Sequence, residues 1–185
     1  MTHEDWAAAT SVASALSSLA GVAVAAYAAW KAQDALSLWQ SQRRMEQAEI
    51  ALVAAVKAIE AMKWITSPIS FSRDDEEPQN EPVARARRDY GARWKAVTSA
   101  LNTYDDVKLA SYARLPLEAT AIFDQLDELI RDVRVAQEMW FSPQNFGAPH
   151  AQEFYWKGLN RREELAELRR QAIAVLSKLA SGADT

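Results

Sequence analysis

The feature that most constrains this chain is a stretch of 25 residues, from Trp6 to Trp30, without a charged residue or a proline. As an α-helix with a rise of about 1.5 Å per residue, it would be roughly 36 Å long. A bilayer core is about 30 Å thick and needs about 20 apolar residues to cross it. Tryptophan favours the membrane–water interface, so Trp6 and Trp30 fit the two ends of a span. The stretch therefore predicts a single-pass transmembrane helix over residues 6–30.

The composition of this stretch leaves two alternatives open. Eleven of its residues are Ala, five are Ser or Thr, and only five are Leu or Val. Alanine contributes little to membrane insertion, so a soluble, buried, Ala-rich helix is the first alternative. A cleaved signal peptide is the second, although the acidic start at Glu4 and Asp5 and the long apolar segment are not typical of one.

Small residues recur at every fourth position of the stretch, which places them along one side of a helix. Such stripes let helices approach closely in lipid and would allow a homo-oligomer to form through the span. In a helix so rich in Ala, a stripe of this kind is also expected by chance. Its members are Ala13, Ser17, Gly21, Ala25 and Ala29.

Basic residues predict the orientation of the proposed span. None precedes it, whereas Lys31, Arg43 and Arg44 follow it. Because positive residues stay on the cytoplasmic side, we expect residues 1–5 to form a short outer tail and the C-terminal body to be cytoplasmic. The predicted location is the cell membrane.

The charge and cysteine content exclude several functions. The net charge is −4, and 21 basic and 23 acidic residues follow residue 30, so the body is nearly neutral. A nucleic-acid-binding protein would show a basic face, so we expect no such partner. The absence of cysteine excludes a disulfide framework and a thiol nucleophile.

The remainder of the chain is typical of an all-α protein. Residues 31–66 lack Pro and Gly and continue the first helix until Ser67-Pro68 ends it. Residues 67–82 form an acidic, Pro-rich loop, which we interpret as a linker because it lacks the ligand spacing of a calcium loop. Residues 83–181 supply the other helices, with the last predicted over 151–180, and residues 182–185 form a tail.

Heptad spacing in three segments predicts an up-down bundle of about four helices, with residues 31–66 as one member. An extended coiled coil between chains is the alternative architecture. The predicted seams are Tyr90, Trp94, Val97, Leu101 and Tyr104; Ile122, Leu126, Leu129, Val133, Ala136 and Trp140; and Leu165, Leu168, Ala172, Val175 and Leu179.

No catalytic or metal-binding pattern is evident. The two histidines, His3 and His150, are too far apart in the predicted topology to form a metal-binding pair. Acidic pairs such as Asp124 and Asp127 fall outside the heptad seams, which indicates a solvated face. We therefore expect neither an enzyme nor a bound cofactor or metal.

Aromatic residues gather between Met139 and Trp156, where six occur in 18 residues, against 9% in the chain. The topology places this segment at the end of the bundle far from the predicted span, so it either closes the open end of the bundle or binds a partner. Aromatic residues and Arg dominate binding hot spots. The candidate partner-binding tip comprises Trp140, Phe141, Phe146, His150, Phe154, Trp156 and Arg161.

Three functions are compatible with these features. The first is a membrane-anchored scaffold or interaction protein that presents its bundle to a partner. The second is a membrane-perturbing effector, of the toxin or phage-defence type, whose spans oligomerise. The third is a helical-bundle ligand sensor, which would need polar groups that converge inside the seams.

Overall fold

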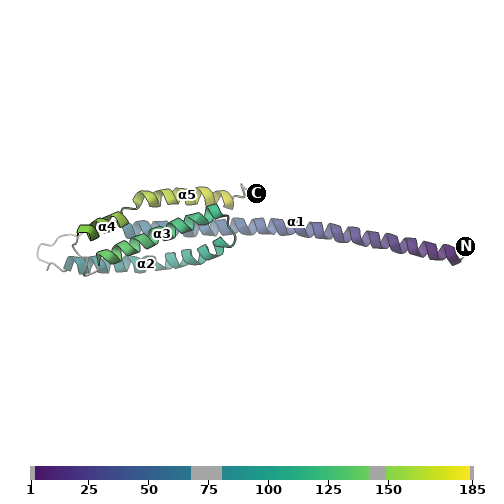
Figure 1. The fold of residues 1–185 in the computed structure, drawn as a ribbon, viewed down its shortest axis with the longest axis horizontal. Helices are drawn as coiled ribbons and strands as arrows, with labels where there is room; N and C mark the ends of the chain where they lie inside the picture. Colours follow the sequence, from purple (N-terminus) through teal and green to yellow (C-terminus); the bar gives the residue numbers. More distant parts are fainter. Residues whose placement is uncertain (1–2, 68–80, 142–148, 184–185) are drawn as a thin grey trace. The chain divides into compact units, whose positions relative to one another are not determined.

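The computed structural model describes residues 3–67, 81–141 and 149–183, and its description of side chains begins at Ser14. These ranges contain helices and turns but no strand, which confirms the all-α class (Figure 1). Five helices are present in them: α1 (His3–Thr66), α2 (Glu81–Tyr112), α3 (Leu117–Trp140), α4 (Pro149–Leu159) and α5 (Arg162–Ala180).

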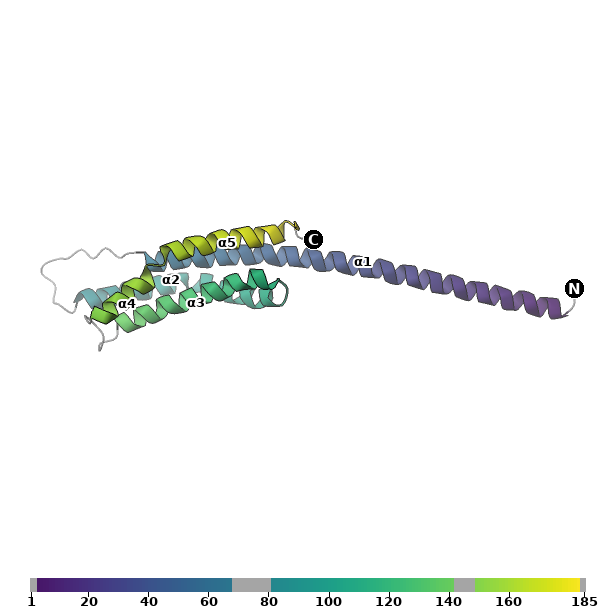
Figure 2. The ribbon, with the colours of Figure 1, turned by 45° about the horizontal axis from the view of Figure 1, so that its top comes forward.

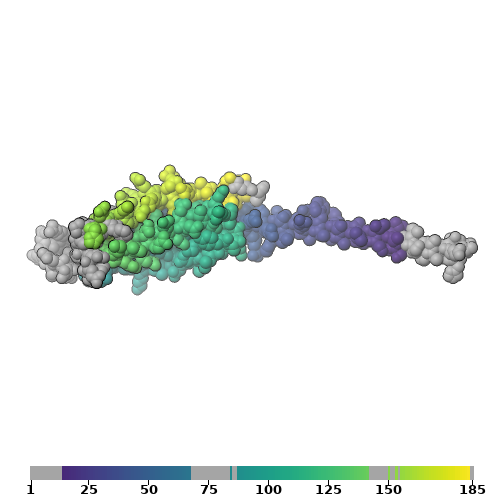
Figure 3. Space-filling model, viewed as in Figure 1, coloured from purple at the N-terminus to yellow at the C-terminus, as the bar shows by residue number. Residues whose placement is uncertain are grey.

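The chain divides into two compact units, Met1–Arg43 and Arg44–Thr185. In the second unit, the C-terminal part of α1 lies alongside α2, α3 and α5, and α4 covers one end (Figures 1 and 2). Side chains of α3 and α5 meet along one face of this unit (Figure 3). The second unit is therefore a helical bundle, as the heptad spacing predicts.

The core of the bundle contains the predicted seams together with an Ala-rich face of α1. Every seam residue of α2, α3 and α5 is buried or half-buried, which confirms the predicted faces. On α1, the side chains of Ala51, Ala55, Ala58 and Met62 are fully buried. Because alanine is small, this face lets neighbouring helices approach closely.

An arginine from α2 caps the C-terminal end of α1. The Nη1 group of Arg93 lies 3.0 Å from the carbonyl oxygen of Trp64 and 2.7 Å from that of Ser67. Its guanidinium also lies over the Trp64 ring, 5.5 Å from the centroid. The last carbonyls of a helix have no partner within it and carry partial negative charge. Arg93 therefore supplies both hydrogen-bond donors and a positive charge at this end.

The segment predicted as one helix over 151–180 is divided into α4 and α5. The helix ends at Leu159, and Arg161 adopts φ −102° and ψ 17°. Gly158 packs so closely on α3 that a Cβ atom at this position would lie less than 3.0 Å from the Cβ of Ala136. The predicted heptad seam of this segment lies entirely in α5, and α4 and α5 both pack on α3.

Two polar networks join the helices of the bundle. The Tyr104 hydroxyl donates to Asp127 Oδ1 at 2.8 Å, and Lys108 Nζ lies 2.7 Å from Asp127 Oδ2. Asp127 therefore joins α3 to α2, rather than belonging to a purely solvated face. In the second network, the buried Gln47 donates to Ser111 Oγ at 3.1 Å and links α1 to α2.

The first unit consists of one stretch of α1. From Ser14 to Arg43, every side chain is exposed except that of Ser41, which is half-buried. The described residues include no helix that is long and apolar enough to cross a membrane, so the transmembrane helix predicted over 6–30 has no support from this part of the chain. The predicted anchor residue Trp6 and the stripe residue Ala13 lie outside the described side chains.

Candidate functional site

A largely apolar groove of about 1080 Å³ lies at the end of the bundle where α1 and α3 finish. The last turn of α1 forms one wall, and α4 with the first turn of α5 forms the other. Its lining residues are Lys63, Thr66, Ser67, Tyr90, Trp140, Glu153, Tyr155, Trp156, Lys157, Leu159, Asn160, Arg162 and Ala166. We call this hollow the aromatic groove.

Tyr155 lies at the centre of the aromatic side chains. Its ring stacks on Trp140, with centroids 4.9 Å apart and an interplanar angle of 22°, and meets Trp156 edge-on at 5.4 Å. Phe141 approaches the same ring at 6.4 Å from the core side. Tyr155 and Phe141 are buried, whereas Trp156 is 55% exposed. The cluster thus combines two buried rings, Tyr155 and Phe141, with the accessible indole of Trp156.

A hydrogen bond between two tyrosines joins Tyr155 on α4 to Tyr90 on α2. The Tyr155 hydroxyl donates to the Tyr90 hydroxyl oxygen at 2.7 Å, and the bond is buried. Burial raises the pKa of Tyr155, and its hydrogen bond to Tyr90 raises it further. Burial also raises the pKa of Tyr90, against the opposing effects of the Tyr155 hydrogen bond and the Arg93 charge. Both hydroxyls therefore stay neutral near pH 7, with Tyr155 as the donor and Tyr90 as the acceptor of the bond.

The charged residues that line the aromatic groove are mainly basic. Lys157 and Arg162 are exposed, and neither forms an ion pair with a described residue. Lys63 also lines the groove, but its Nζ lies 3.0 Å from Glu60 Oε1. Glu153 is the one acid among the described lining residues. A basic groove is a local exception in a chain of net charge −4.

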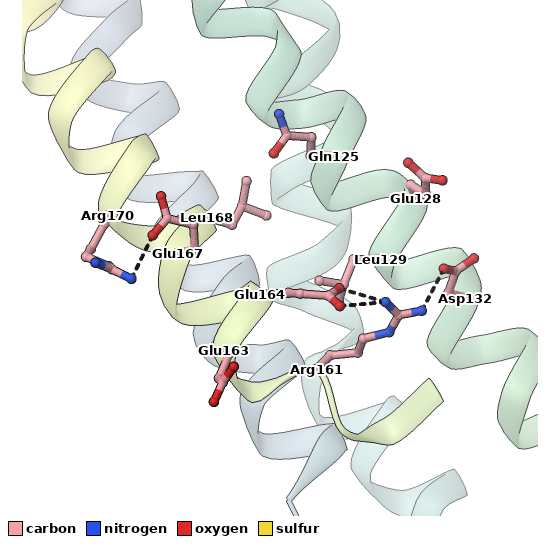
Figure 4. A pocket seen from close by; sticks show the side chains of 10 residues that line it. All are labelled: Gln125, Glu128, Leu129, Asp132, Arg161, Glu163, Glu164, Glu167, Leu168 and Arg170. Atoms are coloured by element: carbon pink, nitrogen blue, oxygen red, sulfur yellow. Dashed lines mark hydrogen bonds and ion pairs between the residues drawn. The ribbon is translucent and has the colours of Figure 1, made fainter. Parts of the chain in front are cut away.

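A second hollow, of about 600 Å³, lies between α3 and α5 and is mostly acidic (Figure 4). Arg161 crosses it, binding Glu164 at 2.7 Å and Asp132 at 3.1 Å. Glu163 and Glu167 also line it. No group of three or more potential metal ligands occurs among the described residues. Since its central arginine is already bound by two carboxylates, this hollow is an ion-pair network between helices.

The structure distributes the predicted tip residues among different surroundings. Trp140 and Trp156 line the aromatic groove, and Phe141 lies in the core beneath it. Arg161 lies in the acidic hollow instead, because α5 begins at the next residue and turns Arg162 towards the groove. The imidazole of His150 is exposed at the start of α4. Phe146 and the side chain of Phe154 lie outside the description.

Sequence reasoning missed two kinds of groove residue. Tyr90 was placed in a heptad seam, and no sequence signal indicated that its hydroxyl would reach Tyr155. Lys157 and Arg162 lie on either side of the break at Asn160 and Arg161. The prediction of one continuous helix over 151–180 therefore does not place them on a common groove.

In the first unit, the described members of the small-residue stripe are all exposed. A Cβ atom built on Gly21 would meet no other atom within 4 Å. At the end of the predicted span, Lys31 Nζ lies over the Trp30 ring, 4.9 Å from its centroid. The described stripe residues are therefore exposed along the helix, and Ser17 bonds only within it, to the carbonyl oxygen of Ser14.

Neither a known protein-family model, nor a curated protein, nor a solved structure matches this chain.

Proposed function

We propose that the protein is a membrane-anchored helical interaction protein, which binds a protein partner in the aromatic groove. The observation that carries this proposal is the accessible Trp156 beside the stack of half-buried Trp140 on buried Tyr155. Interaction hot spots are rich in tryptophan, tyrosine and arginine, and they lie in pockets from which water is displaced. A groove with these residue types at the end of a rigid bundle supports binding rather than catalysis.

The proposed anchor is the N-terminal part of α1. Leu16, Leu19, Val22 and Val24 are each more than 60% exposed in the uncharged stretch of this helix. Covering apolar surface is favourable by about 25 cal/mol per Å², so such a helix favours a lipid or protein environment over water. Its serines are compatible with lipid, because the hydroxyls of Ser17 and Ser18 both donate to the backbone carbonyl of Ser14 at 2.9 Å.

Photo-crosslinking tests the groove as the binding site. A benzophenone amino acid in place of Trp156 should produce a discrete crosslinked protein in the cells that naturally make this chain. The same amino acid in place of Leu117, which is 81% exposed at the start of α3, is the matched control. Identical products from both positions, or none from position 156, would remove the groove from the proposal.

Carbonate washing tests the anchor separately. The full chain should remain with the membrane pellet at alkaline pH, whereas a chain with Leu19→Arg and Val22→Arg should be released. Control substitutions at the equally exposed Leu109 and Leu117 in the bundle should leave the distribution unchanged. Release of the unsubstituted chain would refute membrane insertion but would not bear on partner binding in the groove.

The exposed stripe also supports a second candidate function, that of a membrane-perturbing effector. Ser17, Gly21 and Ala25 leave one side of the helix free of bulky groups, which would let copies pack together in lipid. Strong expression should then collapse the membrane potential, and Gly21→Leu should prevent the collapse. An unchanged potential would exclude this candidate.

A further inference from the structure

The charges around the aromatic groove indicate the chemistry of its partner. Of its described lining residues, three are basic and one is acidic, whereas the whole chain is acidic. Lys157 lies in the last turn of α4 and Arg162 begins α5, so the break between these helices places both residues on the same groove. We infer that the groove binds an acidic peptide segment with one aromatic or aliphatic anchor side chain. This inference rests on the proposed function and names the partner of the same site.

The first turn of α5 separates charges between its two sides. Glu163 and Glu164 line the acidic hollow towards α3, whereas Arg162 and Ala166 line the aromatic groove. Arg161, the N-cap residue of α5, makes no side-chain capping bond. The N-terminal end of a helix carries partial positive charge, which adds to that of Arg162. An anionic group in the groove would therefore meet two cations and the positive end of a 19-residue helix.

The aromatic side chains account for the apolar part of the partner. Trp156 and the Trp140–Tyr155 stack offer an indole face and edge to a single inserted side chain. Acidic side chains on either side of this anchor could then approach Lys157 and Arg162. A bilayer surface is flat and would not fill a groove of about 1080 Å³, so a peptide fits these features better than an anionic membrane.

Selection from a random library of displayed peptides tests the inference on the full chain in mild detergent. Selected sequences should be enriched in Asp and Glu around one aromatic or aliphatic residue. The double charge reversal Lys157→Glu with Arg162→Glu should lower the affinity for a selected peptide by roughly tenfold, as measured by fluorescence anisotropy. Glu153→Gln removes the opposing acid and should strengthen the same peptide. Higher salt should weaken binding to the unsubstituted chain.

The matched control is Arg170→Glu, since Arg170 lies on α5 but lines the acidic hollow and is outside the aromatic groove. It should leave the peptide affinity unchanged. Far-UV circular dichroism of each variant checks that the helices remain folded. Weakening by Arg170→Glu equal to that by the double reversal would show a general charge effect and overturn the inference.

Trp156→Ala separates the failure of this inference from that of the proposed function. If this variant selects the same peptides with the same affinity, the groove is not the binding site and both proposals fail. If Trp156→Ala abolishes binding but the charge reversals do not, the groove binds a partner that is not acidic, and only this inference fails. If the charge reversals lower retention on phosphatidylglycerol vesicles without changing peptide binding, the basic pair serves a membrane surface and the inference is overturned.

Discussion

Gly158 offers a sharp test of how α4 is held against α3. The residue is buried in the last turn of α4, where it contacts α3, and a Cβ atom added to it would lie less than 3.0 Å from the Cβ of Ala136. Ordinary carbon–carbon contacts lie at about 3.5–4.0 Å. Ala136 is fully buried in the C-terminal part of α3, and its Cβ atom is fixed to the backbone, so it cannot turn aside as the end of a long side chain could. Gly158→Ala should therefore displace α4.

Two opposing effects determine the size of the change. Overpacking of a core by one carbon costs about 1–3 kcal/mol. Replacement of glycine by alanine in a helix contributes up to about 1 kcal/mol in the other direction. We expect the free energy of unfolding to fall by roughly 1–2 kcal/mol, which lowers the melting temperature by about 2–4 °C per kcal/mol in a protein of this size.

Urea denaturation followed by circular dichroism measures this effect, with Gly91→Ala as the matched control. A Cβ atom at Gly91 would meet nothing within 4 Å, so the same substitution on α2 should stabilise the protein by up to about 1 kcal/mol. In the background of Ala136→Gly, which removes the opposing Cβ atom, Gly158→Ala should no longer destabilise. Stabilisation by Gly158→Ala in the original background, comparable to that of Gly91→Ala, would refute the close approach of α3 and α4.

Two further predictions concern the polar groups of the bundle. Ser111→Ala removes the partner of the buried Gln47 Nε2 group and should lower the free energy of unfolding by about 1–3 kcal/mol, whereas the pair Ser111→Ala with Gln47→Leu should cost less, as a urea double-mutant cycle would measure. Burial and the neighbouring Asp127 raise the pKa of Tyr104, and the hydrogen bond to Asp124 raises the pKa of Tyr112 to about 12. Both pKa values thus lie above the ordinary tyrosine pKa of 10.0 in the folded protein. The stability that the neutral hydroxyls contribute is therefore fully present below pH 10 and is lost as the pH rises through the folded-state pKa. Stability should therefore decline from about pH 10 upwards, and ultraviolet absorbance should show Tyr104 and Tyr112 ionising above pH 10; ionisation of both near pH 10 in the folded protein would contradict this.

The arrangement of the aromatic groove could be predicted only in part. The density of aromatic residues between Met139 and Trp156 indicated the region, and Trp140 and Trp156 do line one groove. Arg161 was grouped with them because it is close in sequence. Successive residues of a helix are about 100° apart, so Arg161 and Arg162 lie in different hollows once the position of α5 is fixed. Sequence proximity does not determine which of two neighbours faces a site.

Composition and apolar spacing were enough to predict the helical class and the buried faces of α2, α3 and α5. Apolar spacing of three and four residues follows the turn of an α-helix, so seam positions such as Val97, Leu126 and Leu168 could be assigned to the core without knowledge of their partners. The uncharged composition of residues 6–30 likewise belongs to the sequence, and membrane insertion remains a prediction from it.

The break between α4 and α5, and the groove that it forms, depend on how the helices pack together. The close approach of Gly158 to Ala136 depends on the position of another helix, and so does the bond between the Tyr90 and Tyr155 hydroxyls. Periodicity describes one helix at a time and carries no information about the distance or rotation of its neighbours. For this reason the sequence indicated an aromatic end of the bundle, whereas the groove and its basic pair, Lys157 and Arg162, were found only after the helices were placed together.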